Sequence, residues 1–84
     1  DWHTLTESVQ KTGRLVIAHE ANLTGGFGAE VAAKVYGECF YSLESPVVRV
    51  ALPDCRIPSA PHLQAALLPG VPSIVEGVYA CLNA

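Results

Sequence analysis

Two short apolar runs separated by a segment with helical periodicity constrain the fold most. The runs are RLVIAH at residues 14–19 and PVVRVAL at residues 46–52, and their β-branched residues are typical of strands buried on both faces of a sheet. Between them, apolar residues recur at every fourth position from 31 to 43, which predicts a helix over residues 29–43. Two strands joined by such a helix form a right-handed crossover in a parallel sheet.

Further helices are predicted on either side of this unit. Thr4 and Glu7 have the spacing of a capping box, and Gly13 stands where a helix over residues 5–12 ends. Residues 53–62 contain three prolines and predict an extended connection that carries a short helix after it. The segment LPGVPSIVEGVYACLN predicts a last helix with Pro72 in its first turn. Its apolar face is predicted to comprise Ile74, Val75, Val78 and Leu82.

The predicted fold is therefore α/β, with helices covering both faces of a mostly parallel sheet in three layers. At 84 residues the chain is one small domain, which we place at residues 1–84. Two parallel strands leave an unpaired edge on each side, so we expect further strands upstream and interpret the chain as a fragment. Half of the residues are hydrophobic and only 15% are charged, which indicates that some apolar surface meets a partner.

Charge and cysteine usage argue against several classes of protein. The net charge is −3 and the five basic residues are scattered, so nucleic-acid binding is not expected. No apolar run approaches the roughly 20 residues of a membrane span, so no membrane association is expected. Cys39, Cys55 and Cys81 are odd in number and lack a CxxC pair. We expect reduced thiols rather than a disulfide framework or a metal site.

The stretch HEANLTGGFGAE, residues 19–30, begins like a zinc-protease motif. That motif requires a second histidine at position 23, which is Leu23. As neighbours in a strand, His19 and Glu20 point to opposite faces and do not readily share a proton. We expect them to be a hydrogen-bonded pair at the end of the strand that anchors the following loop.

The glycines of the same stretch have the context of a phosphate-binding loop, because a strand leads in and a helix leads out. A dinucleotide fingerprint starting at Gly26 needs glycine or alanine at position 31, which is Val31, and the Gly-Lys of a P-loop is absent. We therefore expect Gly25, Gly26 and Gly28 to form a structural turn. The alternative is a free-standing anion- or nucleotide-binding module. The sequence nominates no catalytic residue and no metal ligand.

Four motifs together resemble one family. ESVQKTGRL, HEANLTGGFGAE, CFYSLESPVVRV and the terminal LPGVPSIVEGV are similar to the carboxyl-terminal domain of the β subunit of thiamine-diphosphate-dependent 2-oxo acid dehydrogenases, in the transketolase superfamily. The combination looks more like the branched-chain (2-oxoisovalerate) than the pyruvate enzymes. The resemblance runs from Asp1 to Ala84 and implies a partial transketolase-type domain that lacks its first strands.

The resemblance also implies a role in assembly. Thiamine diphosphate and Mg²⁺ would be bound outside this fragment, which alone would be inactive, although the parent enzyme is an oxidoreductase. The implied partners are the α subunit and a second β subunit of a heterotetramer, together with the subunit-binding domain of the dihydrolipoyl acyltransferase. Glu44 of the LExP motif and Ala84 match the family's contact points for that domain. The implied location is the bacterial or archaeal cytoplasm or the mitochondrial matrix.

Two departures from the family pattern accompany the resemblance. The usual DTPxP appears here as DCRIP, with Cys55 and Arg56 in the loop, and HEAN stands where HEAP is common. The matching domain of another transketolase-superfamily enzyme is the remaining alternative, against which the HEAxxTGGFGAE and LExP motifs speak.

Overall fold

A computed structural model describes residues 1–54 and 59–84 of the chain. The departure at Cys55 and Arg56 lies outside the described residues. The elements follow one another as α1 (Trp2–Thr12), β1 (Val16–Asn22), α2 (Phe27–Cys39), the 3₁₀ turn η1 (Phe40–Ser42), β2 (Val48–Leu52), α3 (Pro61–Leu67) and α4 (Val71–Leu82).

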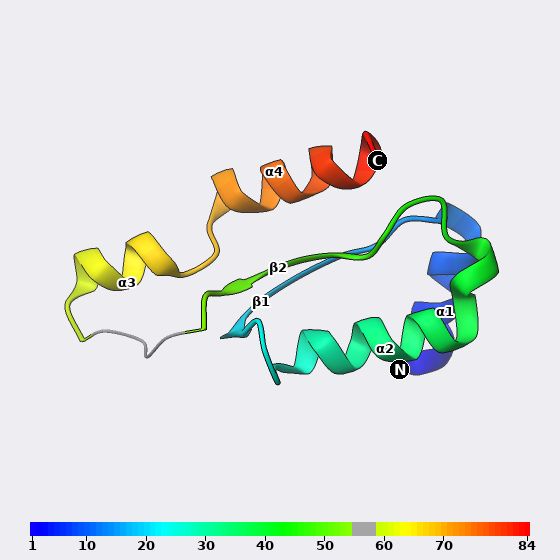
Figure 1. The fold of residues 1–84 in the computed structure, drawn as a ribbon, viewed down its shortest axis with the longest axis horizontal. Coiled ribbons are helices and arrows are strands. Elements are labelled where there is room, and N and C mark those ends of the chain that lie inside the picture. The colour runs from blue at the N-terminus through cyan, green and yellow to red at the C-terminus, as the bar shows by residue number, and fades with distance from the viewer. Residues whose placement is uncertain (55–58) are drawn as a thin grey trace.

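The two strands run parallel, and helices cover both faces of the sheet (Figure 1). Val16 pairs with Val48 and Ala18 with Val50. One face carries α2, which packs in turn against α1, while α4 lies across the other face (Figure 1). The three-layer α/β arrangement and the parallel pairing predicted from the sequence are confirmed.

The first helix begins earlier than predicted. The Asp1 carboxylate accepts hydrogen bonds from the Thr4 amide at 3.1 Å and from the Thr4 hydroxyl at 2.6 Å, so Asp1 is the N-cap of α1. Thr4 lies within the first turn, and the predicted capping box of Thr4 and Glu7 is wrong. The predicted end at Gly13 is confirmed, since Gly13 has the left-handed conformation with φ of 73° that favours glycine.

The core lies between the helices rather than around β1. The prediction of a first strand buried on both faces is wrong, because each of the seven residues of β1 stays partly or fully exposed. The buried cluster consists of Val9, Val35 and Cys39, from α1 and α2. With two described strands, each strand has one edge without a neighbouring strand. The buried cluster therefore lies where α2 packs against α1.

The helix predicted over residues 29–43 is shifted and shortened. It begins at Phe27 and ends at Cys39, after which the chain tightens into η1. Leu43 consequently lies beyond the helix, although its side chain still packs against the cluster of Val9, Val35 and Cys39.

Val75, Val78 and Leu82 of the predicted apolar face do share one side of the last helix, but that side does not pack on the sheet. Val75, Val78 and Leu82 are 45%, 40% and 54% exposed, whereas Gly77 and Cys81 are buried. Small residues allow the axis of α4 to approach the sheet closely, so the bulkier residues are left on the outside. The predicted position of Pro72 in the first turn is confirmed, as is a short helix after the proline-rich connection, α3.

The segment Pro61–Leu82 has the length and apolar composition of a membrane span. The prediction that no run approaches that length is therefore wrong. In the structure the segment forms two helices, α3 and α4, which are separated by Leu68, Pro69 and Gly70. Pro69 supplies no amide hydrogen to continue α3.

Candidate functional site

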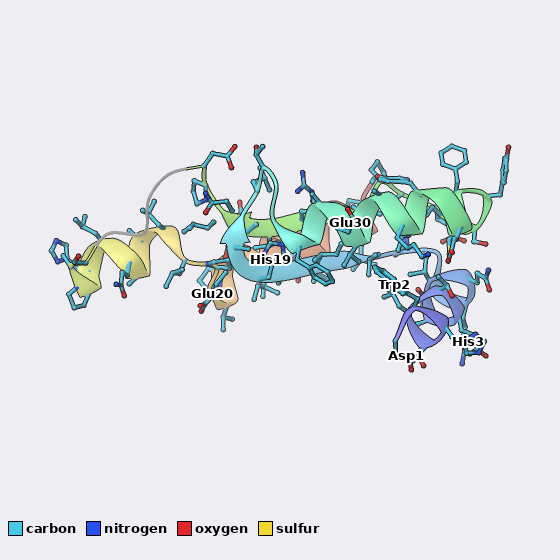
Figure 2. All side chains as sticks on the ribbon, turned by 90° about the horizontal axis from the view of Figure 1, so that it is seen from below. Asp1, Trp2, His3, His19, Glu20 and Glu30 are labelled. Atoms are coloured by element: carbon cyan, nitrogen blue, oxygen red, sulfur yellow. The ribbon has the colours of Figure 1, made fainter. Side chains whose placement is uncertain are left out.

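His19 organises the turn between β1 and α2 (Figure 2). Its Nε2 atom lies 3.0 Å from the Gly28 amide nitrogen, and its Nδ1 atom lies 3.0 Å from the Ala21 amide nitrogen. Both amides are donors, and a neutral imidazole has one acceptor nitrogen. Only one of the two contacts can therefore be a hydrogen bond at a time. The Gly28 contact is the one that ties the strand to the start of α2.

The glycines of the turn serve different structural needs. A Cβ on Gly28 would lie 2.0 Å from His19 Nε2, and a Cβ on Gly26 would lie 2.0 Å from the Asn22 carbonyl oxygen. Gly25 has a φ of 73°, a backbone conformation that residues with a side chain rarely adopt. Each substitution would thus strain the turn.

The amides at the start of α2 are largely in use. The Gly28 amide faces His19, and the Ala29 amide donates to the Gly26 carbonyl at 3.0 Å. Anion sites at helix starts depend on free amides, so an anion would have to displace the His19 ring. Glu20 is exposed, and its side chain has no hydrogen bond or ion pair within the described part of the chain. The predicted hydrogen-bonded pair is therefore wrong for Glu20, and His19 alone anchors the loop. The arrangement supports a structural turn better than a ligand site.

A second set of contacts, which the sequence did not reveal, fastens this turn to the end of β2. The Thr24 amide donates to Asp54 Oδ1 at 2.9 Å, and the Thr24 hydroxyl donates to Asp54 Oδ2. Arg49 Nη1 donates to the Leu23 carbonyl at 2.6 Å. Hydrogen bonds from the Thr24 hydroxyl and then from the Thr24 amide are the main causes that hold the pKa of the Asp54 carboxyl below its ordinary value. Desolvation opposes them, and the charge of Arg49 makes the smallest contribution in their favour.

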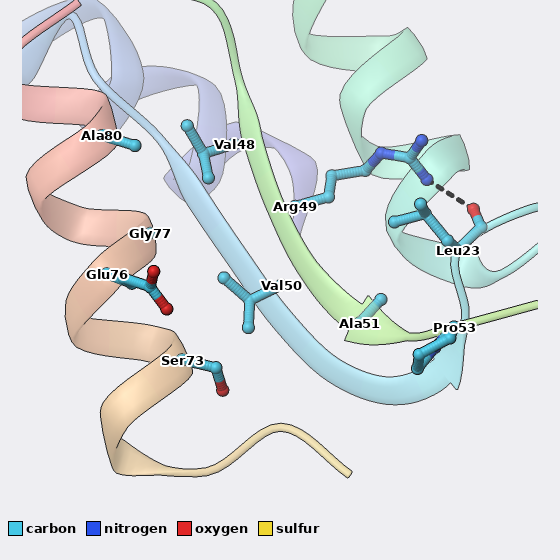
Figure 3. A pocket seen from close by; sticks show the side chains of 10 residues that line it. All are labelled: Leu23, Val48, Arg49, Val50, Ala51, Pro53, Ser73, Glu76, Gly77 and Ala80. Carbon is cyan, nitrogen blue, oxygen red and sulfur yellow. Dashed lines mark hydrogen bonds between the residues drawn. The ribbon is translucent and has the colours of Figure 1, made fainter. Parts of the chain in front are cut away.

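The Arg49 contact borders an open hollow of about 520 Å³ between β2 and α4 (Figure 3). Apolar side chains of β2 form one wall, and Ser73, Glu76 and Gly77 of α4 form the other. Gly77, where α4 approaches β2 closely, is one of the residues that line this opening.

Glu44 and the carboxyl-terminal end of α4 meet at one corner of the molecule, which we call the Arg14 corner. Arg14 Nε lies 3.7 Å from Glu44 Oε2, while Arg14 Nη1 donates to the Cys81 carbonyl at 2.5 Å. The Arg14 side chain is 28% exposed and that of Glu44 is 65% exposed. Ala84, also exposed, follows Cys81 by three residues. The structure thus brings the two predicted contact points to the same end of the fold, through an arginine that sequence reasoning missed.

The residues beneath the Arg14 corner, Ser45 and Cys81, are buried and hydrogen-bonded. Ser45 Oγ lies 3.2 Å from Cys81 Sγ, and Cys81 Sγ lies 3.8 Å from the Leu15 carbonyl oxygen. Ser45 and Cys81 are 7% and 2% exposed. The Cys81 and Cys39 thiols are free and buried. The contact between Ser45 and Cys81 holds the backbone next to Glu44 against the end of α4.

Comparison with known proteins agrees with the motifs. The family description "Transketolase, C-terminal domain" matches residues 1–74. The chain is 53% identical over 58 residues to "2-oxoisovalerate dehydrogenase subunit beta 2, mitochondrial" of Arabidopsis thaliana, which covers 69% of this chain and 16% of that protein. It is 49% identical over 78 residues to "Pyruvate dehydrogenase E1 component subunit beta" of Leifsonia xyli, covering 93% and 23% respectively.

A third relative, "3-methyl-2-oxobutanoate dehydrogenase subunit beta" of Mycobacterium tuberculosis, is 40% identical over 78 residues, which cover 93% of this chain and 22% of that protein. The chain therefore spans only 16 to 23% of the length of these relatives. The resemblance inferred from the motifs is confirmed by these matches.

Proposed function

The chain belongs to the transketolase carboxyl-terminal domain family, and we propose that it forms the assembly domain of the β subunit of a 2-oxo acid dehydrogenase. The support is its similarity to β subunits of branched-chain and pyruvate enzymes. In this proposal the whole enzyme oxidatively decarboxylates a 2-oxo acid and acylates a lipoyl group. It works in the cytoplasm of a bacterium or archaeon or in the mitochondrial matrix.

The chemistry itself is assigned to the remainder of that enzyme. Thiamine diphosphate with Mg²⁺ would supply the decarboxylation chemistry, and the residues described here do not fit the metal. Within residues 1–54 and 59–84, no three His, Cys, Asp or Glu side chains are grouped as metal ligands would be. The amides at the start of α2 are committed to His19 and Gly26. The proposed contribution of this chain is therefore to hold proteins together.

The observation that carries the proposal is the geometry of the Arg14 corner. Arg14 contacts Glu44 while remaining bonded to the Cys81 carbonyl, so it orients the carboxylate beside the end of α4. A 3.7 Å contact and 65% exposure leave the Glu44 carboxylate able to accept a second, shorter hydrogen bond. Arginine pairs with carboxylates in a bidentate manner. We propose that Glu44 receives an arginine of the subunit-binding domain of the dihydrolipoyl acyltransferase, with Ala84 at the edge of the contact.

The remaining proposed partners are the α subunit and a second β subunit. Their support is the outer face of α4, where Val71, Val75, Val78 and Leu82 are exposed at spacings of four, three and four residues. This spacing forms one continuous apolar stripe along a helix. An exposed stripe of this kind is suited to a protein interface.

The docking proposal is tested by Glu44→Lys in the intact heterotetramer. Reversing the charge places a cation against Arg14 and against the incoming arginine, so the dissociation constant for the subunit-binding domain should rise about 30-fold or more, on the order of 2–5 kcal/mol. Glu30→Lys is the matched control, because Glu30 is exposed on α2 and makes the same change of charge. An affinity that Glu44→Lys leaves unchanged would remove Glu44 from the site.

A further inference from the structure

Both ring nitrogens of His19 face backbone donors. Nε2 lies 3.0 Å from the Gly28 amide nitrogen, and Nδ1 lies 3.0 Å from the Ala21 amide nitrogen. A neutral imidazole has one acceptor nitrogen and one N–H group, whereas a protonated imidazole has two N–H groups and no acceptor. Charging the ring therefore removes every hydrogen bond that His19 can accept from these two amides.

The contact between His19 and Gly28 is too close for a charged ring to keep. A Cβ on Gly28 would lie 2.6 Å from His19 Cδ2, so the ring lies directly against the backbone at the start of α2. With a proton on Nε2, two N–H groups would point at each other across the 3.0 Å between their nitrogens. The start of a helix also carries a partial positive charge, which repels an imidazolium. Both effects favour separation of the charged ring from the start of α2.

No ion pair within the described residues compensates for a charge on His19. The charged groups on β1 and on the elements that pack against it are Glu20 of β1, Glu30, Lys34 and Glu38 of α2, Arg49 and Asp54 at β2, and Glu76 of α4. Glu20 is next to His19 in the strand, so its side chain lies on the opposite face of the sheet, which is the face that α4 covers. On the face of His19, Lys34 and Glu38 pair with each other. None of these carboxylates pairs with the ring.

Separate contacts hold the other part of the turn. The Thr24 amide donates to Asp54 Oδ1 at 2.9 Å, and Arg49 Nη1 donates to the Leu23 carbonyl at 2.6 Å. The hydrogen bonds from Thr24 hold the pKa of the Asp54 carboxyl below its ordinary 3.8. These contacts therefore persist between about pH 5 and pH 8, the range in which histidines change charge. A proton on His19 affects the start of α2 while residues 23 and 24 stay bonded to β2.

We propose that His19 is a pH-controlled latch between β1 and α2. The neutral ring holds the Gly28 amide, and the protonated ring releases it, so that the first turn of α2 separates from the end of β1. The second proton binds only the released state, and a ligand that binds one of two states shifts the equilibrium toward that state. The His19 latch goes beyond the proposed docking function and does not depend on it, because it involves neither Glu44 nor Ala84.

The test follows hydrogen–deuterium exchange of the Gly28 amide in the full-length protein from about pH 8 to about pH 5.5, across the range in which histidines change charge. Mass spectrometry with electron-transfer fragmentation resolves the single amide, and each rate is divided by the intrinsic rate at that pH. Protection should fall about fivefold or more as the pH drops, as loss of one hydrogen bond implies. The Gly13 amide, which donates to the Val9 carbonyl at 2.7 Å, is the internal control and should keep its protection. Constant protection at Gly28 would overturn the latch.

Two variants separate His19 from the other histidines, His3 and His62, which are exposed on α1 and α3. His19→Gln places an acceptor oxygen that does not titrate near the position of Nε2, whereas His19→Asn places one near the position of Nδ1. Protection of Gly28 should become independent of pH in both variants, and it should be higher in His19→Gln. A fall in protection with pH that persists in either variant would assign it to another group and overturn the proposal. If a variant fails to fold, as lost protection at Gly13 would show, the pH series of the unaltered protein decides.

Discussion

Replacing Gly77 with alanine is expected to destabilise the fold, although alanine is the better helix former. A Cβ at this position would lie 2.6 Å from Val50 Cγ2, 3.5 Å from Val48 Cγ1 and 3.7 Å from Val16 Cγ1. The gain in helix propensity is about 1 kcal/mol. Forcing a methyl group into a packed interface costs about 1–3 kcal/mol, and valine at a strand has little rotamer freedom with which to yield. The net effect is therefore a loss of about 0–2 kcal/mol.

Gly37→Ala supplies the control, because Gly37 is also inside a helix but a Cβ there would meet nothing within 4 Å. It should gain about 1 kcal/mol, so the two variants should differ by about 1–3 kcal/mol. For a chain of this size that difference corresponds to a separation in Tm of roughly 4–8 °C per kcal/mol. Thermal unfolding followed by circular dichroism at one fixed protein concentration measures it. An equal rise in Tm for both variants would refute the close packing of α4 on the sheet.

Two further predictions concern the turn that HEANLTGGFGAE forms. The Asp54 carboxyl should titrate below its ordinary pKa of 3.8. The stabilisation from its bonds to Thr24 is therefore complete above that pH and is lost as the pH falls through the lower pKa of the folded state. Thr24→Val should return the pKa toward 3.8 in a carboxyl NMR titration, and an unchanged pKa would exclude the Thr24–Asp54 hydrogen bonds as its cause. His19→Ala should speed hydrogen exchange at the Gly28 amide about fivefold, as loss of a hydrogen bond worth about 1 kcal/mol implies. Unaltered protection would show that His19 does not hold the start of α2.

Local sequence patterns predicted the order of the elements because each one depends on nearby residues. The β-branched runs and the four-residue periodicity specify β1, α2 and β2, and Gly13 specifies the end of α1 through its left-handed conformation. The cap of α1 was assigned to the wrong residue because both Asp1 and Thr4 are good N-caps. Only the structure shows that Asp1 accepts from Thr4.

Burial could not be predicted in the same way, because it depends on which elements face each other. Periodicity alone favoured the bulky stripe of α4 as its packed face, yet close approach to the sheet selects Gly77 and Cys81. Glycine carries little hydropathy, so an amphipathic pattern does not register Gly77. Burial of β1 could not be predicted either. Its composition indicates a strand covered on both faces, but whether it is covered depends on which other elements pack against it.

The sequence predicted only some of the residues of the candidate site. Glu44 and Ala84 entered through a family resemblance, forty residues apart, and nothing in their spacing indicates Arg14 as the residue between them. Arg14 lies 67 residues from Cys81 in sequence, and its role depends on the start of β1 meeting the end of α4.

The central claim, that the Arg14 corner is the docking surface, is tested most directly by hydrogen–deuterium exchange of the intact enzyme with and without the subunit-binding domain. Slower exchange is predicted at the amides of residues 40–45 and 81–84, with residues 22–28 unchanged. Protection centred on residues 22–28, with none at 40–45, would contradict the account and return the glycine turn to consideration as a binding site.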